Sequence, residues 1–365
     1  MRFAFATLIS LALFSAAPAF AQELVPDTIV TAKARVIEVI SREERYVPGT
    51  PVQSWYQKIR VEILEGAEAG KEVVVENDYL ELLPGEIFYL THYTSGLDAT
   101  DYYAVDEPYR LPALGVLFAL FVAVVLFFGG KQGLRGLLSL GGSLFFILFL
   151  LLPGIVQGYP PVLVSMLVAS FIVVLGSYAT HGFTKTTSTA VLGMIGTVII
   201  TGLLAYVSIA LTRLSGFSAD ETIYLNINSG GSLDVAGLLL SGMLIGTLGV
   251  LYDAAIGQSV SVEELASAGS HLSRAEVYRR AVRIGREHIG ALVNTLAIAY
   301  VGASLPLLLL FYGFGTESIA LSLNREIFAT ELVRAMVGSI GLVLAVPLTT
   351  AIAVRFLVKK EEHAT

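Results

Sequence analysis

One carboxylate lies within an apolar stretch that is long enough to cross a lipid bilayer. Asp253 belongs to the run GMLIGTLGVLYDAAIGQ, in which glycine recurs and no other side chain is charged. An ionisable group in such a segment is costly unless it faces the protein interior or water, so it marks a functional site by default. A carboxylate in this setting can hold a proton or a small cation, or guide one along a pathway.

Three polar residues are expected at the depth of Asp253. Asn294 and Thr295 lie about as far from the inner end of the next apolar segment, and Thr349 lies at a similar distance from the inner end of the last one. We therefore predict an intramembrane polar site made of Asp253, Asn294, Thr295 and Thr349. A second interpretation stays open, because a carboxylate this close to the interface can also reach lipid headgroups or bond to a neighbouring helix.

An ion pair is expected at the opposite, outer face. Glu331 and Arg334 stand three residues apart in ATELVRAMVGSIG, so they can pair on one side of a helix. Two roles fit this pair, which either anchors the helix at the outer interface or lines an outward vestibule.

A basic amphipathic helix is predicted before the sixth apolar segment. Ser273 and Glu276 form a capping box that starts it. Its cations lie opposite the face that carries Val277, Ala281 and Ile284, so the helix is expected to rest on the anionic inner leaflet. These cations are Arg279, Arg283 and Arg286. Two interpretations of these cations stay open: they are a positive-inside topology signal, or they form a lipid or partner site.

The sequence excludes several classes of site. The chain has no cysteine, which removes disulfides, thiolate metal ligands and a cysteine nucleophile. Its 5 histidines are scattered, and no two of them have ligand spacing, so we expect no metal and no cofactor. The sequence contains no Ser/His/Asp constellation, and it has no basic patch suited to nucleic acid outside the membrane-flanking loops. We therefore predict that the protein is not an enzyme.

The elements that must position these residues are membrane helices. Hydrophobic residues make up 55% of the 365-residue chain and charged residues only 15%, and the mean hydropathy of +0.74 is too high for one water-soluble core. Apolar segments of the length that crosses roughly 30 Å of hydrocarbon follow one another from residue 111 to 358. We predict about seven spans: 111–128, 137–155, 160–179, 188–211, 234–257, 289–312 and 328–354.

Small residues predict where these helices approach each other closely. The expected packing stripes are Gly242–Gly246–Gly249, Gly193–Gly196 and Gly338–Gly341. Pro306 and Pro347 free backbone carbonyls and are expected to kink the sixth and seventh spans.

The orientation follows from two independent signals. Residues 1–21 combine an early Arg2, a short apolar run and a small-x-small end at Ala19 and Ala21, which predicts a secretory signal peptide; an uncleaved first anchor is the alternative. Lys and Arg concentrate in the loops that then face inward, as expected for a plasma-membrane protein. The bundle, 111–358, is then followed by a cytoplasmic tail, 359–365.

Residues 22–110 are predicted to form a small all-β barrel or sandwich outside the membrane. Their apolar residues alternate in runs that predict about five short strands. The turn GAEAGKE resembles a phosphate loop, but its spacing is wrong and strands flank it, so we interpret it as a hairpin turn. The expected fold is thus a mainly α-helical polytopic bundle preceded by this β domain.

Several of these motifs resemble one family. The runs LYDAAIGQSVSVEEL, RRAVRIGREHIGALVNTLAIAYVGASLPLLLLF and ATELVRAMVGSIGLVLAVPLTT are similar to the YibE/F family of polytopic bacterial membrane proteins. The segment KIRVEILEGAEAGKEVVVEN resembles the exterior β domain of its YibE branch. The resemblance implies this architecture in a bacterial inner membrane and implies no settled activity. The membrane half of SecF-type proton-driven permeases is also similar, although the chain lacks their large exterior porter domain.

Two functions of different classes follow as hypotheses. The first is a permease or transport component that lies in the lipid bilayer and takes a small ion or solute. The second is a non-transporting scaffold or assembly factor whose β domain binds an extracytoplasmic partner or a second copy of the chain.

Overall fold

The computed structural model describes residues 28–46, 49–78, 80–95, 100–269, 271–314 and 318–359. The predicted signal peptide, residues 1–21, and the tail from residue 360 lie outside the described residues. The chain divides into two compact units, one ending at Phe121 and the other beginning at Val122.

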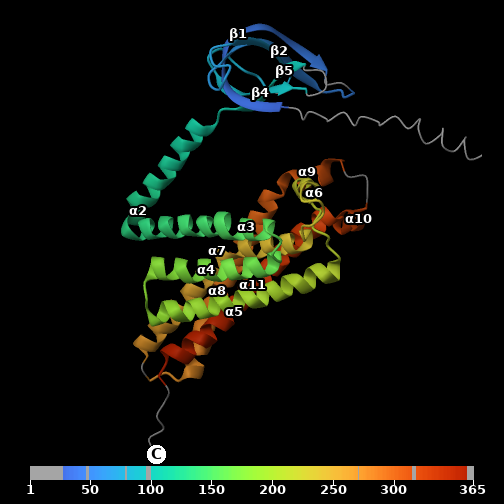
Figure 1. Cartoon of the computed structure of the whole chain (residues 1–365). Helices are drawn as coiled ribbons and strands as arrows, with labels where there is room; N and C mark the ends of the chain where they lie inside the picture. The colour runs from blue at the N-terminus through green and yellow to red at the C-terminus, as the bar shows by residue number, and fades with distance from the viewer. Residues whose placement is uncertain are drawn as a thin grey trace, which may run out of the picture. The chain divides into compact units, whose positions relative to one another are not determined.

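The first unit contains the five predicted strands (Figure 1). They form one antiparallel sheet in the order β3-β2-β1-β4-β5. Apolar and polar residues alternate along these strands, because one face of the sheet is buried. The strands are β1 (Thr28–Tyr46), β2 (Gln53–Ile63), β3 (Glu72–Asn77), β4 (Ile87–Thr94) and β5 (Asp101–Pro108). The stretch GAEAGKE is the turn between β2 and β3, as predicted, and the N–H of Gly70 closes it by donating to Ile63 O at 2.8 Å.

The sheet curls into a partly open barrel because β1 bends and the two outer strands, β3 and β5, come into contact. Register shifts in β1 after Val36 and after Val39 mark the bulges that bend it. Inside lies an apolar core that includes Ile59 and Phe88, both 0% exposed. The buried Gln57 fastens the loop before β4, because its amide donates to Leu82 O and accepts from Leu82 N.

The second unit is a bundle of long helices (Figure 1). Its hydrophobic segments are helical because backbone polar groups in a bilayer must be satisfied within the segment. The elements, including the helix that enters this unit, are α2 (Leu111–Phe146), η1 (Ile147–Leu151), α3 (Leu152–Val156), α4 (Pro161–His181), α5 (Lys185–Thr212), α6 (Asp220–Asn228), α7 (Val235–Ala268), α8 (Arg274–Ala303), α9 (Leu305–Phe314), α10 (Ile319–Asn324) and α11 (Glu326–Leu357).

Five helical segments among the described residues are long and apolar enough to cross a membrane. The first, Leu111–Val156, covers two of the predicted spans, and the non-helical Gly130 (φ 53°, ψ −134°) lies between them. Helices α8 and α9 pass the same test as a pair but bend by 65°, next to Pro306. Helix α11 is continuous through Pro347. The number of seven spans stays a prediction.

Helices α5, α7 and α11 pack against one another and form the centre of the bundle, with α4 and α8 on its outside. Glycine permits the close approach of α5 and α11 at two levels. A Cβ at Gly193 would lie 2.3 Å from Thr349 Oγ1, and a Cβ at Gly341 would lie 2.3 Å from Thr201 Oγ1. These two predicted packing stripes are confirmed.

The two ends of the bundle are fastened by side chains that bond to backbone. At the end where α7 begins, which we call the Val235 end, Glu326 Oε1 accepts from the N–H groups of Ser215 at 2.8 Å and Gly216 at 2.7 Å. At the other end, the Ala268 end, the Arg274 guanidinium donates to Val358 O at 2.8 Å. A cation there bonds the carbonyls left free at the end of α11.

Candidate functional site

Helix α7 presents one open face. Gly242, Gly246, Gly249, Asp253 and Gly257 are all exposed, and their spacing of three and four residues places them on one side of the helix. A Cβ at the first, third or last of these glycines would meet nothing within 4 Å. Of the predicted packing stripe of α7, Gly246 alone meets a neighbour, because a Cβ there would lie 3.3 Å from the Tyr300 hydroxyl oxygen of α8; the prediction is wrong for Gly242 and Gly249. We call this surface the open face of α7.

Two cavities adjoin the open face. The first measures about 510 Å³ and is lined by Gly242 and Gly246, by η1, α3 and the segment 216–222, and by Arg334 of α11; we call it the Arg334 cavity. The second measures about 380 Å³ and lies between α2, α4 and α7; we call it the Tyr252 cavity. Ile245 lines both, so they are neighbours along α7.

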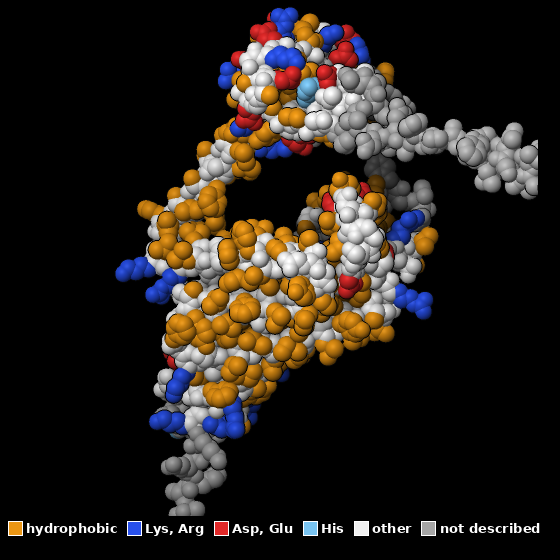
Figure 2. Space-filling view, viewed as in Figure 1, with side chains coloured by type: hydrophobic (Ala, Val, Ile, Leu, Met, Phe, Trp, Pro, Cys, Tyr) orange, Lys and Arg blue, Asp and Glu red, His pale blue; other side chains and the backbone are white. Residues whose placement is uncertain are grey.

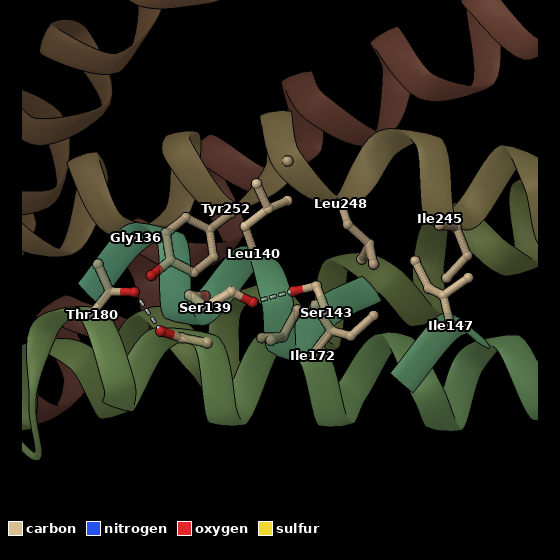
Figure 3. Close-up of a pocket in the computed structure, with 13 residues that line it drawn as sticks. Gly136, Ser139, Leu140, Ser143, Ile147, Ile172, Thr180, Ile245, Leu248 and Tyr252 are labelled. Atoms are coloured by element: carbon tan, nitrogen blue, oxygen red, sulfur yellow. Dashed lines mark hydrogen bonds between the residues drawn. The ribbon is translucent and has the colours of Figure 1, made fainter. Parts of the chain in front are cut away.

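The Tyr252 cavity is mostly apolar with a few hydroxyl groups. Figure 3 shows Tyr252 and Leu248 of α7 reaching toward Ser139 and Ser143 of α2. Ser143 and Thr180 donate to carbonyls of their own helices. The Tyr252 hydroxyl oxygen is buried and has no hydrogen-bond partner among the described residues. The cavity therefore offers one hydroxyl that a ligand or a water can bond.

The structure separates Thr349 from the other three residues of the predicted polar site. Asp253, Asn294 and Thr295 have exposed side chains, and the hydroxyl of Thr295 donates to Ala291 O on its own helix. Thr349 is 0% exposed and packs against Gly193 of α5. Equal depth along the helices thus does not bring Thr349 to the surface that carries Asp253, because the two side chains point to different faces.

Sequence reasoning missed a buried polar contact at the centre of the bundle. Gln258 of α7 is 3% exposed, and its Oε1 accepts from the hydroxyl of Thr350 of α11 at 2.9 Å. Gly285 of α8 makes room for it, since a Cβ there would lie 2.5 Å from Gln258 Nε2. The sequence does contain a signal for this contact, because Gln258 is an amide at the end of an apolar run. The predicted fifth span ended at residue 257 and therefore did not include it.

The predicted pair of Glu331 and Arg334 is present in α11, with Arg334 Nη1 3.3 Å from Glu331 Oε1. Arg334 also lines the Arg334 cavity, as one of the two predicted roles requires. Its Nε is buried and has no acceptor among the described residues. The hydroxyl oxygen of Tyr300 lies nearby on α8, 3.3 Å from where a Cβ at Gly246 would be.

The basic helix is also present, as the first part of α8. Ser273 Oγ accepts from the N–H of Glu276 at 3.3 Å, so one half of the predicted cap is confirmed. Figure 2 shows Lys and Arg side chains at the end of the bundle where α11 finishes. The exposed residues Arg279, Arg283 and Arg286, together with Arg280 and Tyr278, surround a hollow of about 590 Å³.

The buried face of this helix differs from the prediction at one position. Val277 and Ala281 are 0% exposed as expected, but Ile284 is 38% exposed. Gly285 takes its place at the contact with α7 and α11. A step of four residues from Ala281 stays on the contact line, and the close approach of Gln258 leaves room for glycine alone.

A charged cluster lies in the β unit. Lys71 Nζ is 2.6 Å from Glu68 Oε1 and 2.8 Å from the hydroxyl of Tyr103. The ring of His92 stacks on Tyr103 at 4.4 Å, with its nitrogens 3.4 Å from Glu68 and 3.2 Å from Asp101. The cluster joins the β2–β3 turn to β4 and β5, which closes one side of the barrel.

Hydrogen bonds in this cluster favour the charged forms of Glu68, Lys71 and Asp101. The bond from Lys71 lowers the pKa of the Glu68 carboxyl, and in return the pKa of the Lys71 ammonium is raised above its usual value. The bond from the Thr94 hydroxyl lowers the pKa of Asp101. Within the described residues, no group of three or more His, Asp or Glu side chains has the geometry to hold a metal ion.

These observations define a class of protein: a polytopic α-helical membrane protein with an N-terminal antiparallel β half-barrel. Comparison with protein families gives the family. Residues 117–359, more than half of the chain, match the family described as YibE/F-like protein. The chain belongs to this family, as the motifs of α7, α8 and α11 predicted. Searches of curated proteins and of solved structures found no match.

Proposed function

We propose that the chain is a permease or transport component of a bacterial inner membrane and catalyses no reaction of its own. The observation that carries the proposal is the open face of α7, which adjoins two cavities and reaches Asp253. Glycines leave space beside a helix for a solute, and a carboxylate at membrane depth can hold a proton or a small cation. The ligand is then a small ion or solute, and the lipid bilayer surrounds the bundle.

The predicted orientation gives this path a direction through the membrane. Positive residues assign the Ala268 end to the cytoplasm, so the β unit and the Val235 end face outward. The Arg334 cavity then belongs to the outer half of the bundle, and Asp253 belongs to the inner half. A solute that follows the open face passes the Arg334 cavity, then the Tyr252 cavity, and then Asp253.

Asp253→Asn tests this proposal. We expect the variant to lose an ion- or proton-linked flux while its abundance stays at the wild-type level, because the exposed carboxylate bonds to no other side chain among the described residues. The measurement compares solute accumulation in a deletion strain that carries either the wild-type chain or the variant. Glu72→Gln, at an exposed carboxylate on β3 of the β unit, is the charge-matched control. Loss of abundance alone, or wild-type accumulation, contradicts the proposal.

A scaffold role has one observation in its favour. The long hairpin of β1 and β2 carries cation–aromatic pairs, with the Arg42 guanidinium 3.9 Å from the Trp55 ring and the Arg45 guanidinium 3.6 Å from the Tyr56 ring. Trp55 is 40% exposed and Tyr46 is 66% exposed. Aromatic and arginine side chains of this kind are enriched in protein interfaces. The partner would be an extracytoplasmic protein or a second copy of the chain.

The same strains separate the two functions. Trp55→Ala removes an exposed ring of the hairpin and leaves the open face of α7 intact. A scaffold predicts that this variant behaves like the deletion strain while Asp253→Asn behaves like the wild type. A permease predicts the reverse.

A further inference from the structure

The Arg334 cavity has the composition of a binding site for an amphipathic ligand. Its volume of about 510 Å³ is in the range of small-molecule sites, roughly 300–1,000 Å³. Arg334 is the one ionisable side chain in its lining, which consists entirely of described residues. Leu151, Leu152 and Ile155 form an apolar wall from η1 and α3, and Ile245 of α7 adds to it. The cavity thus combines one cation with a hydrocarbon-like surface.

The guanidinium of Arg334 has N–H donors that Glu331 does not use. Glu331 takes up Nη1 of Arg334 at 3.3 Å, whereas Nε is buried with no acceptor among the described residues. A guanidinium carries five N–H donors and keeps its charge at any physiological pH. A buried donor without a partner is unfavourable, so an acceptor supplied by a ligand in this cavity is stabilised. Carboxylates are the acceptors that guanidinium groups bind in a bidentate way.

The lining also argues against other ligands. A metal cation needs oxygen ligands, and no carboxylate lines the cavity. An organic cation would meet the charge of Arg334. A sugar would find few polar partners beyond the hydroxyls of Ser218, Thr222 and Ser241. A small monoanion with an apolar body satisfies both the cation and the wall.

We propose that the Arg334 cavity binds a small amphipathic monoanion, with its carboxylate on Arg334 and its hydrocarbon part against Leu151, Leu152 and Ile155. This inference rests on the proposed function, because it names the solute class that enters the path along α7. The binding site is nonetheless testable by itself, since occupancy requires no transport.

The test measures binding of octanoate to the purified full chain in uncharged detergent micelles free of lipid. Isothermal titration gives the affinity, and thermal unfolding gives the shift in Tm. Octanol and octyltrimethylammonium, which have the same chain length, show what the hydrocarbon tail and the opposite charge contribute. We expect octanoate to raise the Tm more than either of them does.

Two variants and a control locate the ligand. Arg334→Gln is expected to weaken octanoate binding by about tenfold or more, because it removes a charge-assisted hydrogen bond. Arg213→Gln, at the same end of the bundle but outside the cavity lining, should bind like the wild type. Gly242→Leu fills the cavity from the open face, where a Cβ meets nothing within 4 Å, and should block binding without lowering the Tm of the free protein. This variant decides the matter if Arg334→Gln does not fold.

Several results would overturn the site. Equal Tm shifts with octanoate and octanol would show an apolar cavity that ignores the carboxylate. Stronger binding of octyltrimethylammonium than of octanoate would show that the cavity prefers a cation to an anion. Wild-type affinity in Gly242→Leu would place the ligand elsewhere. Asp253→Asn should keep its octanoate affinity while it loses flux. Wild-type flux in Asp253→Asn together with selective octanoate binding would contradict the proposed function alone, and lost flux without selective octanoate binding to the wild-type chain would contradict the site alone.

Discussion

One added methyl group at residue 193 tests the packing that holds α5 against α11. A Cβ at Gly193 would lie 2.3 Å from Thr349 Oγ1 and 2.8 Å from Thr349 Cβ and Cγ2. Both positions are in the interior of continuous helices, so the backbones must separate to relieve the overlap. Overpacking of this kind costs about 1–3 kcal/mol, and the better helix propensity of alanine returns at most about 1 kcal/mol. We expect Gly193→Ala to lower the free energy of unfolding by about 1–2 kcal/mol.

The assay is reversible unfolding of the purified chain in mixed micelles with increasing SDS, followed by far-ultraviolet circular dichroism. Gly249→Ala is the matched control, because a Cβ there meets nothing within 4 Å and the helix gains up to about 1 kcal/mol. In the double variant Gly193→Ala/Thr349→Ala, the loss of Oγ1 and Cγ2 should restore about 0.5 kcal/mol or more. Equal stability of Gly193→Ala and Gly249→Ala would refute the packing of α5 against α11.

Two further predictions concern the buried amide and the β unit. Thr350→Val leaves Oε1 of Gln258 without its donor and should lower the free energy of unfolding by about 1–3 kcal/mol in the same assay. Thr295→Val, at an exposed hydroxyl, is the control and should cost less than about 0.5 kcal/mol. Equal stability of the two variants would contradict the buried hydrogen bond between Thr350 and Gln258. Acid should destabilise the β unit, because the pKa of Glu68 is lower in the folded than in the unfolded chain. The ionised carboxylate stabilises the fold fully at pH values above the unfolded-state pKa of about 4.3. This stabilisation is lost as the pH falls through the folded-state pKa of Glu68. Trp55 is the only tryptophan of the chain, so its fluorescence during denaturant unfolding reports this unit; equal stability at pH 7 and at about pH 3 would contradict the role of the charged cluster.

Local patterns predicted the β unit closely, since its strands alternate and their turns contain glycine. All five predicted strands are present among the described residues, and β1, at 19 residues, is longer than the short strands expected. The bulges after Val36 and Val39, which curl the sheet, follow from the closure of the barrel. Periodicity of the single strand holds no information on that closure.

The candidate site was predicted only in part, because glycine spacing shows a small face and not what covers it. Gly193 and Gly341 meet threonine side chains of a partner helix, whereas Gly249 meets nothing within 4 Å. Depth along the helices did predict a level for Asp253, but the rotation of each helix about its axis separates Asp253 from the buried Thr349. That rotation is set by contacts between α5, α7 and α11, which lie far apart in the sequence.

Hydropathy did not predict the ends of the helices, for a related reason. Hydropathy ended the fifth span at residue 257, yet α7 continues to Ala268 because its polar last turns pack against α8 and α11. The amphipathic helix and the sixth span likewise form one helix, α8, from Arg274 to Ala303. Tertiary contacts keep these segments helical where the apolar pattern stops.

The absence of cysteine allows a direct measurement of the central claim, which is that the open face of α7 lines a water-accessible path. Single cysteines at Gly246, Gly249 and Asp253 would be treated in intact membranes with a charged, membrane-impermeant methanethiosulfonate, which reacts with the thiolate. Leu167→Cys, 54% exposed on α4, tests exposure to lipid, and Leu251→Cys, 1% exposed on α7, tests burial. We expect all three open-face cysteines to react faster than both controls, and we expect octanoate to slow the reaction at Gly246. Open-face rates no higher than the rate at Leu167→Cys would show that this surface faces lipid, and would contradict the proposed path.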